Sequence, residues 1–430
     1  MVGVRREVGA MARAEIQRTE VYDVLVVGAG MVGSTLAVAL ADAGLSVVLI
    51  DGQDPDRALE ETFDGRSSAI ARGSQQALAG LGLWRAMAEG AEAILHIRVS
   101  DGKMGAGTSA LFLHYDHREV DGAPLGYIVE NRVIRRALRA RLGELPDLRV
   151  LAPRRVEDLD RAGAQVTARL DDGTELRARL IVGAEGRRSP TREAAGLRTT
   201  SWSYPQVGLV ATVAHEHPHH GVAHENFLPA GPFAMLPMTD GADGTHRSSI
   251  VWTEKRELAA TLLALDDADF GREIERRFGD TLGTLRPVGG RWSYPLSLMH
   301  ANRTIDRRLA LVGDAAHVIH PISGQGLNLG LKDVAALAES VVDAWRLGLD
   351  PGDGLVLERY QRWRRLDNLL LIAATDGLNR LFSNDLGPVR LIRDLGLAAV
   401  NRAPALKRLF MGHAMGLVGD LPRLIRGEAL

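Results

Sequence analysis

The residues most typical of a ligand-binding site lie in the stretch 309–333, LALVGDAAHVIHPISGQGLNLGLKD, which combines glycines, acids and apolar runs. An apolar run predicts a buried strand, Gly313-Asp314 ends it, and a loop containing Gly324 and Gly326 leads into a helical pattern. Backbone N–H groups at the start of a helix lack partners and carry partial positive charge, so they suit an anionic ligand. Asp314, at the strand end, could accept hydrogen bonds from ligand hydroxyls. An ordinary strand–loop–helix with glycines for tight turns remains an alternative interpretation.

A second glycine-rich segment lies near the N-terminus, between two apolar runs. The run 22–27 is followed by Gly28, Gly30 and Gly33, then by a helical pattern and a second run that ends at Asp51. This is the βαβ dinucleotide-binding fingerprint in its required context. The first two glycines let the chain turn and approach a pyrophosphate, and the third lets helix and strand pack closely. Asp51 is placed for a ribose 2′-hydroxyl, but the motif does not choose between NAD and FAD.

A third glycine segment, IVGAEGRRS at 181–189, follows an alternating region that predicts a β-meander with a turn at Asp171-Asp172-Gly173. It places Glu185 and Gly186 just after a strand. An acid at this place could serve a ligand or only the turn itself.

Composition limits the classes of function. The chain has 430 residues, 46% of them hydrophobic and 25% charged, which predicts a globular protein of two or three domains. The net charge of -2 gives no field that favours nucleic acid. The absence of cysteine excludes disulfides, iron–sulfur clusters, thiol chemistry and a cysteinyl-flavin bond. Residues 1–20 lack the apolar core of a signal peptide, and we expect a disordered leader there.

Two features could suggest other partners. The basic helical pattern at 127–142 has no interleaved aromatic residues, so it indicates a solvated helix face and no nucleic-acid surface. A histidine-rich segment at 215–224 has no familiar ligand spacing, and Pro218 interrupts any regular face. We therefore expect a polar loop there and no metal.

The three segments, in this order, resemble the signatures of FAD-dependent aromatic-ring monooxygenases, specifically the ubiquinone-biosynthesis hydroxylase subfamily. GDAAH followed by HPISGQGLNLGLKD carries the closest likeness, which extends over roughly residues 20–400. The resemblance selects FAD and implies that Asp314 binds the ribityl chain. It further implies that five consecutive residues lie against the pyrophosphate and the isoalloxazine ring: Gly324, Gln325, Gly326, Leu327 and Asn328.

The resemblance also implies flavin-side roles for residues outside these loops. Arg66, in the segment 64–70, looks like the arginine that lies near the flavin in this family. Arg132 corresponds to a flavin-contacting position. Glu185, which replaces the usual Asp, and Gly186 belong to a motif tied to FAD and to the nicotinamide donor.

The implied fold is α/β: a Rossmann-like FAD-binding domain with an inserted antiparallel β-sheet substrate domain and a helical C-terminal tail. The expected division is 21–95, 121–197 and 297–350 for the FAD-binding domain, 96–120 and 198–296 for the substrate domain, and 351–430 for the helical region. Residues 224–237 resemble the substrate-side strand of the subfamily, although Asn226 stands where relatives often carry Arg.

The implied activity is hydroxylation of the aromatic ring of a polyprenylated phenol in ubiquinone biosynthesis. O2 would react through a C4a-hydroperoxyflavin, with NADPH or NADH as electron donor. No side chain is assigned as catalytic, because the cofactor carries the chemistry. The rival hypotheses are another FAD enzyme on this fold (an epoxidase, a halogenase or a polyprenyl reductase) and a non-catalytic prenyl-binding assembly protein.

The tail at 351–430 combines apolar helical faces with many arginines. Such helices bind an anionic membrane surface or a biosynthetic complex, or they simply pack on the protein body. We expect a cytoplasmic protein, either free or peripheral on the inner membrane, since no apolar run is long enough to span a bilayer.

Overall fold

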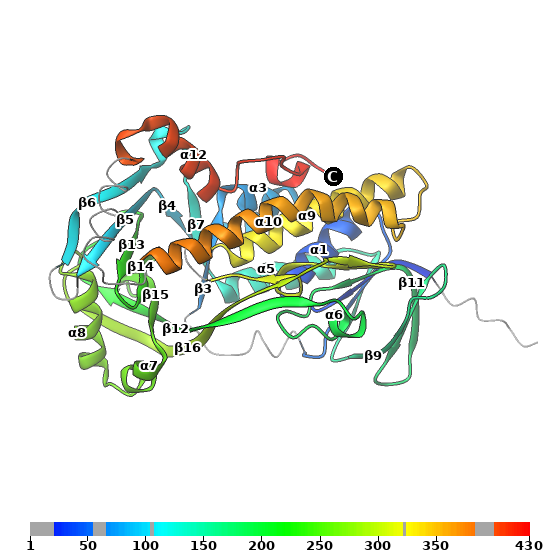
Figure 1. Cartoon of the computed structure of the whole chain (residues 1–430), viewed down its shortest axis with the longest axis horizontal. Coiled ribbons are helices and arrows are strands. Elements are labelled where there is room, and N and C mark those ends of the chain that lie inside the picture. Colours follow the sequence, from blue (N-terminus) through cyan, green and yellow to red (C-terminus); the bar gives the residue numbers. More distant parts are fainter. Residues whose placement is uncertain (1–20, 55–65, 104–106, 321–323, 383–399) are drawn as a thin grey trace, which may run out of the picture.

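The computed structural model describes residues 21–54, 66–103, 107–320, 324–382 and 400–430. The predicted leader at 1–20 lies outside them, as does part of the signature loop, 321–323. The described chain forms three sheets with helices around them (Figure 1). The sheet that holds the N-terminal fingerprint lies at one end of the elongated molecule, and an antiparallel sheet lies at the other.

The first sheet contains the predicted βαβ unit and has the strand order β17-β18-β11-β1-β2-β8, with β10 and β9 added beyond β11. Its strands are β1 (Val21–Val27), β2 (Val47–Ile50), β8 (Leu148–Leu151), β9 (Val156–Asp160), β10 (Val166–Leu170), β11 (Glu175–Gly183), β17 (Ile305–Asp306) and β18 (Leu309–Leu311). β18, β11, β1, β2 and β8 run parallel to one another. Parallel strands are buried on both faces, which explains their continuous apolar runs.

Helices cover this sheet and carry its largest apolar cluster. They are α1 (Met31–Asp42), α3 (Arg72–Gly80), α4 (Trp84–Met87), α5 (Asn131–Glu144), α6 (Pro190–Ala194) and α9 (Gly326–Arg346). α9 packs between α1 and the long helix α10 (Gly354–Phe382). Leu36, Val334 and Tyr360, one from each of these three helices, are completely buried or nearly so. The helix that follows the signature loop is therefore central to the core.

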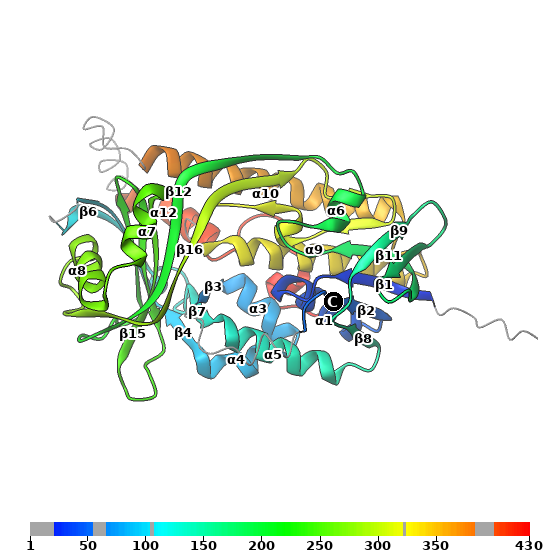
Figure 2. The same ribbon diagram turned by 90° about the horizontal axis from the view of Figure 1, so that it is seen from below.

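The second sheet has the order β19-β16-β12-β15-β14-β13-β5-β6. Its strands are β5 (His96–Lys103), β6 (Gly107–Asp116), β12 (Thr199–His215), β13 (Val222–Leu228), β14 (Gly231–Met238), β15 (His246–Lys255), β16 (Leu285–Ala301) and β19 (His317–Val318). β12 and β16 are long strands that run between the two ends of the molecule (Figure 2). β19 belongs to the GDAAH segment, so this segment contributes one strand to each large sheet.

The two faces of the second sheet have different neighbours. One face, with Phe233 and Trp252, packs under α7 (Arg256–Leu263) and α8 (Asp267–Phe278). The other face, with Ala223 and Met238, packs toward the third sheet, formed by β3 (Ser67–Ala71), β7 (Gly126–Glu130) and β4 (Ala91–Ile94). The face that carries Ala223 and Met238 is therefore turned toward the third sheet.

The C-terminal region continues from α10 to α12 (Pro404–Ala414) and a short 3-10 turn (Arg423–Arg426). Met411, Met415 and Ile425 are buried, so this region packs on the body. Among the described helices, none has the length and apolar character that crossing a bilayer would require. The predicted α/β fold with an inserted sheet and a helical C-terminal region is confirmed. The inserted sheet is antiparallel, as predicted, except for one parallel pair, β13 with β5.

Candidate functional site

The glycine loop after β1 shows why each glycine is needed. Gly28 has φ +106°, and a Cβ there would lie 2.5 Å from the carbonyl oxygen of Ala184. A Cβ at Gly33 would lie 1.9 Å from the carbonyl oxygen of Gly28. At Gly30, in contrast, a Cβ would meet no atom within 4 Å. Gly28 and Gly33 thus permit close packing, and Gly30 borders open space that a ligand could fill.

Asp51, at the end of β2, holds this loop in place. Its Oδ2 accepts a hydrogen bond from the backbone N–H of Ala29 at 2.5 Å, and its Oδ1 accepts one from Gln53 at 2.7 Å. A carboxylate has about four acceptor positions, so both oxygens can still accept a bond from a ligand hydroxyl. The predicted ribose contact is compatible with this geometry.

The three glycine segments, far apart in the sequence, meet at one place. Gly28 of the N-terminal segment packs against Ala184 of the segment 181–189. A Cβ at Gly313, which has φ +58°, would lie 3.1 Å from the side chain of Val32 in α1. The segment 309–333 therefore packs against the N-terminal segment, and each of the three segments has a glycine with open space at its Cβ position: Gly30, Gly186 and Gly326.

Asp314 lies close to this meeting point. The residue is exposed, yet surrounding protein raises the pKa of its carboxyl by desolvation, which His317 and Arg187 partly offset. Arg187 belongs to the third segment, so its influence on Asp314 is further evidence that the segments converge.

A buried ionic network holds the residues on either side of Asp314, Gly313 and His317, in place. Asp333 of α9 is fully buried and accepts a hydrogen bond from the backbone N–H of Gly313 at 3.1 Å. His317 Nε2 lies 2.5 Å from the same carboxylate oxygen, Oδ2, and Arg364 Nε of α10 donates to the other, Oδ1, at 2.8 Å. Burial alone would raise the pKa of Asp333, but His317 and Arg364 outweigh it and lower it to about 2. No local motif in the sequence marks this network.

The loop before α9 also has two kinds of glycine. Gly324 has φ +61°, and a Cβ there would lie 3.1 Å from the Cβ of Ala69 in β3. A Cβ at Gly326, the first residue of α9, would meet no atom within 4 Å. Gln325 precedes the helix and makes no side-chain cap, so the first N–H groups of α9 receive no bond from it. Leu327 is half-buried against the main core.

Asn328 is committed to the protein itself. Its Oδ1 accepts a hydrogen bond from the backbone N–H of Ala71 at 2.8 Å, and its Nδ2 donates to the carbonyl oxygen of Ala69 at 2.9 Å. These bonds tie β3 to the loop before α9. The side chain thus helps to position the site, and the implied contact of this residue with the cofactor stays a prediction.

The remaining predicted residues lie around this core. Arg66 directly precedes β3, and its carbonyl oxygen accepts a hydrogen bond from the backbone N–H of Asn131 at 3.0 Å. Arg132 pairs with the buried Glu130, which also lies 3.2 Å from Arg247 of β15. This charged cluster joins the third sheet to the second.

Glu185 caps the short helix α6. Its carboxylate accepts hydrogen bonds from the Ser189 hydroxyl at 2.7 Å and from the Thr191 backbone N–H at 3.1 Å. The turn interpretation therefore describes this side chain in the structure. Gly186 has φ +83° and open space at its Cβ position.

Comparison with known proteins identifies the family. A family model described as an FAD binding domain matches residues 21–365. The chain belongs to this family. Over 414 residues it is 55% identical to the ubiquinone hydroxylase UbiL of Rhodospirillum rubrum, covering 96% of this chain and 94% of the relative. It is 34% identical over 396 residues to the 3-demethoxyubiquinol 3-hydroxylase of Escherichia coli, covering 92% and 98%.

A solved structure extends the comparison to the fold. PqsL of Pseudomonas aeruginosa in complex with 2-aminobenzoylacetate aligns with a TM-score of 0.73 at 24% identity, covering 88% of this chain and 99% of that one. At this identity the likeness shows the fold alone. Because the chain belongs to the FAD-binding family and its relatives are hydroxylases, this flavoprotein is an FAD-dependent hydroxylase. FAD fits the site, because Gly30 and Gly326 leave open space at their Cβ positions and Asp314 is exposed.

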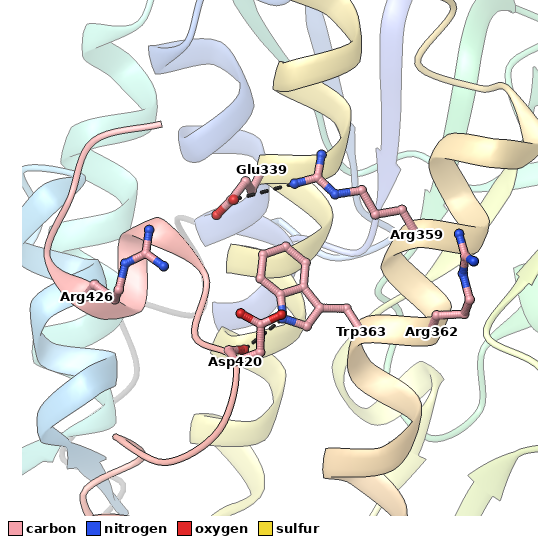
Figure 3. A pocket seen from close by; sticks show the side chains of 6 residues that line it. All are labelled: Glu339, Arg359, Arg362, Trp363, Asp420 and Arg426. Carbon is pink, nitrogen blue, oxygen red and sulfur yellow. Dashed lines mark hydrogen bonds and ion pairs between the residues drawn. The ribbon is translucent and has the colours of Figure 1, made fainter.

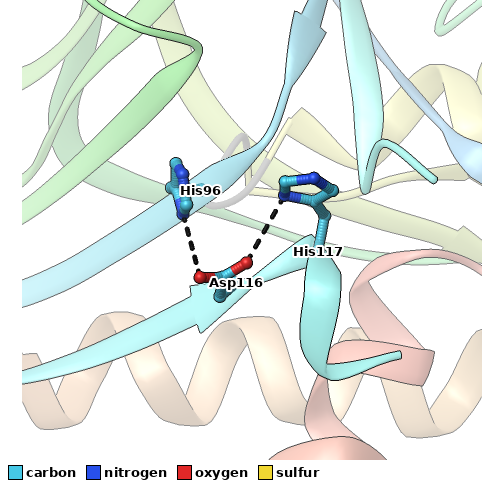
Figure 4. Close-up of side chains that lie close together, drawn as sticks. All are labelled: His96, Asp116 and His117. Carbon is cyan, nitrogen blue, oxygen red and sulfur yellow. Dashed lines mark ion pairs between the residues drawn. The ribbon is translucent and has the colours of Figure 1, made fainter. Parts of the chain in front are cut away.

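The flavoprotein has one further cluster with metal-ligand chemistry among its described residues, formed by His96, Asp116 and His117 (Figure 4). Asp116 accepts hydrogen bonds from Arg118 on both oxygens, and Arg118 holds the pKa of that carboxyl well below its usual range. His117 Nδ1 lies 3.0 Å from the carbonyl oxygen of Leu95, so that nitrogen must carry a proton. These bonds occupy the groups that a metal would need. The histidines of the predicted polar loop likewise bond to protein: His215 to Ser248 and His219 to Met238.

A polar pocket of about 540 Å³ lies where the C-terminal turn meets α9 and α10 (Figure 3). Its lining residues are Glu339, Arg359, Arg362, Trp363, Asp420 and Arg426. The Trp363 indole donates to the carbonyl oxygen of Asp420 at 2.7 Å, and Arg359 lies 3.6 Å from Glu339. The pocket is therefore a junction that fastens the chain end to the helices.

Proposed function

We propose that this flavoprotein hydroxylates the aromatic ring of a polyprenylated phenol in ubiquinone biosynthesis, using O2 and electrons from NADPH or NADH. The observation that carries the proposal is the meeting of the three glycine segments at one place, in a chain that is 55% identical to a ubiquinone hydroxylase over nearly its full length. Bound FAD supplies the oxygen chemistry. The protein supplies position, electrostatics and exclusion of water.

The predicted residues are assigned on this basis. Asp314 accepts hydrogen bonds from the ribityl chain, Asp51 from the ribose, and the open space beside Gly30 accommodates the pyrophosphate. The N–H groups at the start of α9, from Gly326 onward, face the pyrimidine edge of the flavin, where negative charge develops on reduction. We retain five residues at the border of the site with less direct roles: Arg66, Arg132, Glu185, Gly186 and Gly324.

The proposed domain division follows the sheets. The segments 21–95, 121–197 and 297–350 hold FAD, and 96–120 with 198–296 form the substrate domain. β12 and β16 cross between these parts. The phenol is therefore expected between the second sheet and the first domain.

The experiment that tests the function uses the purified holoprotein with a polyprenylated phenol, NADPH or NADH, and 18O2. We expect one 18O atom in the phenolic product, with oxygen uptake that depends on the phenol. In a strain without the protein, an unhydroxylated quinone precursor should accumulate. Flavin without phenol-dependent oxygen uptake would favour another FAD chemistry, and a protein that binds no flavin would favour an assembly role.

We also propose that the protein lies on the cytoplasmic side of the inner membrane. Apolar side chains at helical spacing are exposed on α10, where Leu366 is 67% and Leu370 58% exposed, and on α12, where Leu409 is 48% exposed. Arginines flank both groups, so the surface suits anionic lipids. The alternative partner of the same surface is a biosynthetic complex.

Vesicle flotation tests the membrane assignment. Wild-type protein should float with anionic vesicles and detach as salt rises, whereas the variant L366Q/L370Q/L409Q should remain unbound. Leu355, which is 75% exposed elsewhere on α10, provides the matched control L355Q. Flotation that survives the triple substitution would refute this surface.

A further inference from the structure

Glu225 of β13 points to the side of the second sheet that is turned toward the FAD-binding domain. Its neighbours in the strand point the other way. Asn226 accepts a hydrogen bond from Ser100 at 2.8 Å, and the ring of His224 packs edge-on against Phe278 of α8 at 5.1 Å. Because side chains alternate along a strand, Glu225 shares its face with its register partners Val99 and Ala234.

This face is apolar and reaches the cofactor loop. It carries Ala223, Leu236 and Val99, which pack in one cluster with Met411 and Met415 of the C-terminal region. The same cluster includes Ala69 of β3. Ala69 is the residue that a Cβ at Gly324 would approach to 3.1 Å, and its carbonyl oxygen accepts a hydrogen bond from Asn328. The apolar layer that contains Glu225 thus ends at the loop that opens α9.

Glu225 makes no hydrogen bond or ion pair with the part of the chain that the structure describes, although it is only half-buried and its carboxylate is accessible. Burial raises its pKa to about 7, and no charged neighbour contributes to that shift. The charged and titratable residues on the elements packed around this face are Asp101, Tyr115, Glu92, Tyr127, Glu130, Arg247, Lys407, Arg408 and His413, and Arg247 pairs with Glu130. A carboxylate without a partner in an apolar layer costs stability, so a structural role does not explain it.

We propose that Glu225 is the base that accepts the hydroxyl proton of the phenol during ring hydroxylation, an inference that rests on the proposed function. The phenolic O–H bond breaks, the proton moves to a carboxylate oxygen of Glu225, and the O–H electron pair is released into the ring. The ring carbon then forms its C–O bond with one atom of O2. The other atom leaves as water, reduced by the two electrons of the nicotinamide donor. The ring carbon releases its own proton, which with the hydrogen of the donor hydride and one solvent proton supplies the new hydroxyl and the water. Glu225 returns the phenolic proton to the phenolic oxygen.

The first test compares E225Q with E225D and with the control E175Q, which changes an exposed strand glutamate of β11. A general base contributes about 100-fold or more to the rate, so E225Q should lose at least about 100-fold in kcat/KM for the phenol. Flavin reduction by the nicotinamide donor in the absence of phenol should be unchanged. E225D should keep the limb of the pH profile that reports the base, and E225Q should lose it.

The second test needs no turnover. We would titrate 4-nitrophenol, whose ionised form absorbs visible light, into the holoprotein near pH 7, where a substantial part of Glu225 is ionised. Wild type and E175Q should bind it with a larger ionised fraction than E225Q. Equal ionised fractions together with equal kcat/KM in wild type and E225Q would overturn the proposal. If wild type ionises the probe but hydroxylates no polyprenylated phenol, the proposed function fails and the assignment of Glu225 as a phenol base stands. If E225Q does not fold, E225D must still show a reduced rate with the pH limb retained, and a wild-type rate with a wild-type ionised fraction would refute the role.

Discussion

Replacing Asp333 by Asn should weaken both the fold and FAD retention. Asp333 is fully buried, and its two oxygens face opposite sets of donors: Gly313 and His317 on one side, Arg364 on the other. An asparagine has one acceptor oxygen and one NH2 group. Whichever way it turns, the NH2 group faces a donor, and the buried guanidinium loses one of its two carboxylate partners.

The magnitude follows from the burial of the partners. The side chain of Arg364 is 4% exposed and that of Asp333 0%. Breaking such a buried pair by removing one charge costs about 3–5 kcal/mol, and we expect that loss in the free energy of unfolding of D333N. FAD affinity should fall as well, because the same carboxylate holds the Gly313 N–H that precedes Asp314.

The assay combines denaturant unfolding with measurement of bound flavin. D367N is the matched control, since Asp367 also pairs with Arg364 but its side chain is 33% exposed. Its cost should be no more than about 1 kcal/mol. The double variant D333N/R364Q should recover part of the stability that D333N loses, because it removes a buried cation that has lost its buried carboxylate partner.

The pH dependence gives a further check. The depressed pKa of Asp333, about 2, means that its contribution to stability is present above the pKa of the unfolded state and is lost only as pH falls through about 2. The defect of D333N should therefore be constant from about pH 5 to 8. A variant within about 1 kcal/mol of wild type that retains its flavin would refute the reasoning.

Three further predictions concern single side chains. Asp314→Ala should weaken FAD binding by about 1.5–3 kcal/mol, the value of a hydrogen bond to a charged group; flavin affinity by titration measures it, and full occupancy with unchanged affinity would contradict it. Gly326→Val places a side chain in the open space at the start of α9. The flavin reduction potential should therefore fall, and more hydrogen peroxide should be released per phenol hydroxylated. A variant with the wild-type potential and the wild-type ratio of peroxide to product would show that the loop is only a turn. Glu225 has a pKa raised to about 7, so the folded state binds its proton more tightly than the unfolded state and wild type loses stability as pH rises from about 4.5 to 7. E225Q should thus be more stable than wild type above pH 7, by up to about 3 kcal/mol, and as stable as wild type in acid. Thermal unfolding at a series of pH values measures this. A stability difference between the two proteins that does not change with pH would refute it.

The sequence predicted those parts of the site that depend on local sterics. Gly28 and Gly313 occupy left-handed backbone positions beside close neighbours, and such requirements leave a visible glycine in a fixed spacing. The parallel strands were equally readable, because burial on both faces produces continuous apolar runs.

Long-range partners were not readable in the same way. Asp333 and Arg364 lie on different helices, and no local pattern marks two side chains that meet only after α9 and α10 pack. Asn328 carries a motif position, yet its bonds to Ala69 and Ala71 depend on where β3 lies. Glu185 was open to two interpretations because a turn acid and a ligand-binding acid look alike in sequence.

The GDAAH segment, which supplies β18 to one large sheet and β19 to the other, limits how this protein can be recombined with its relatives. A chimaera that exchanged only 198–301 would replace Met299 and His300 of β16, which pair with Val318 and His317, by foreign residues that must pair with the resident β19. The two β19 residues lie within four positions of Asp314, so a mismatch in that short ladder would displace the cofactor site together with the new substrate surface. To transfer the substrate preference of a relative, β12, β16 and the 309–333 segment should therefore be exchanged together. Alternatively, point substitutions can be made on the face of β13 and β14 that packs toward the third sheet.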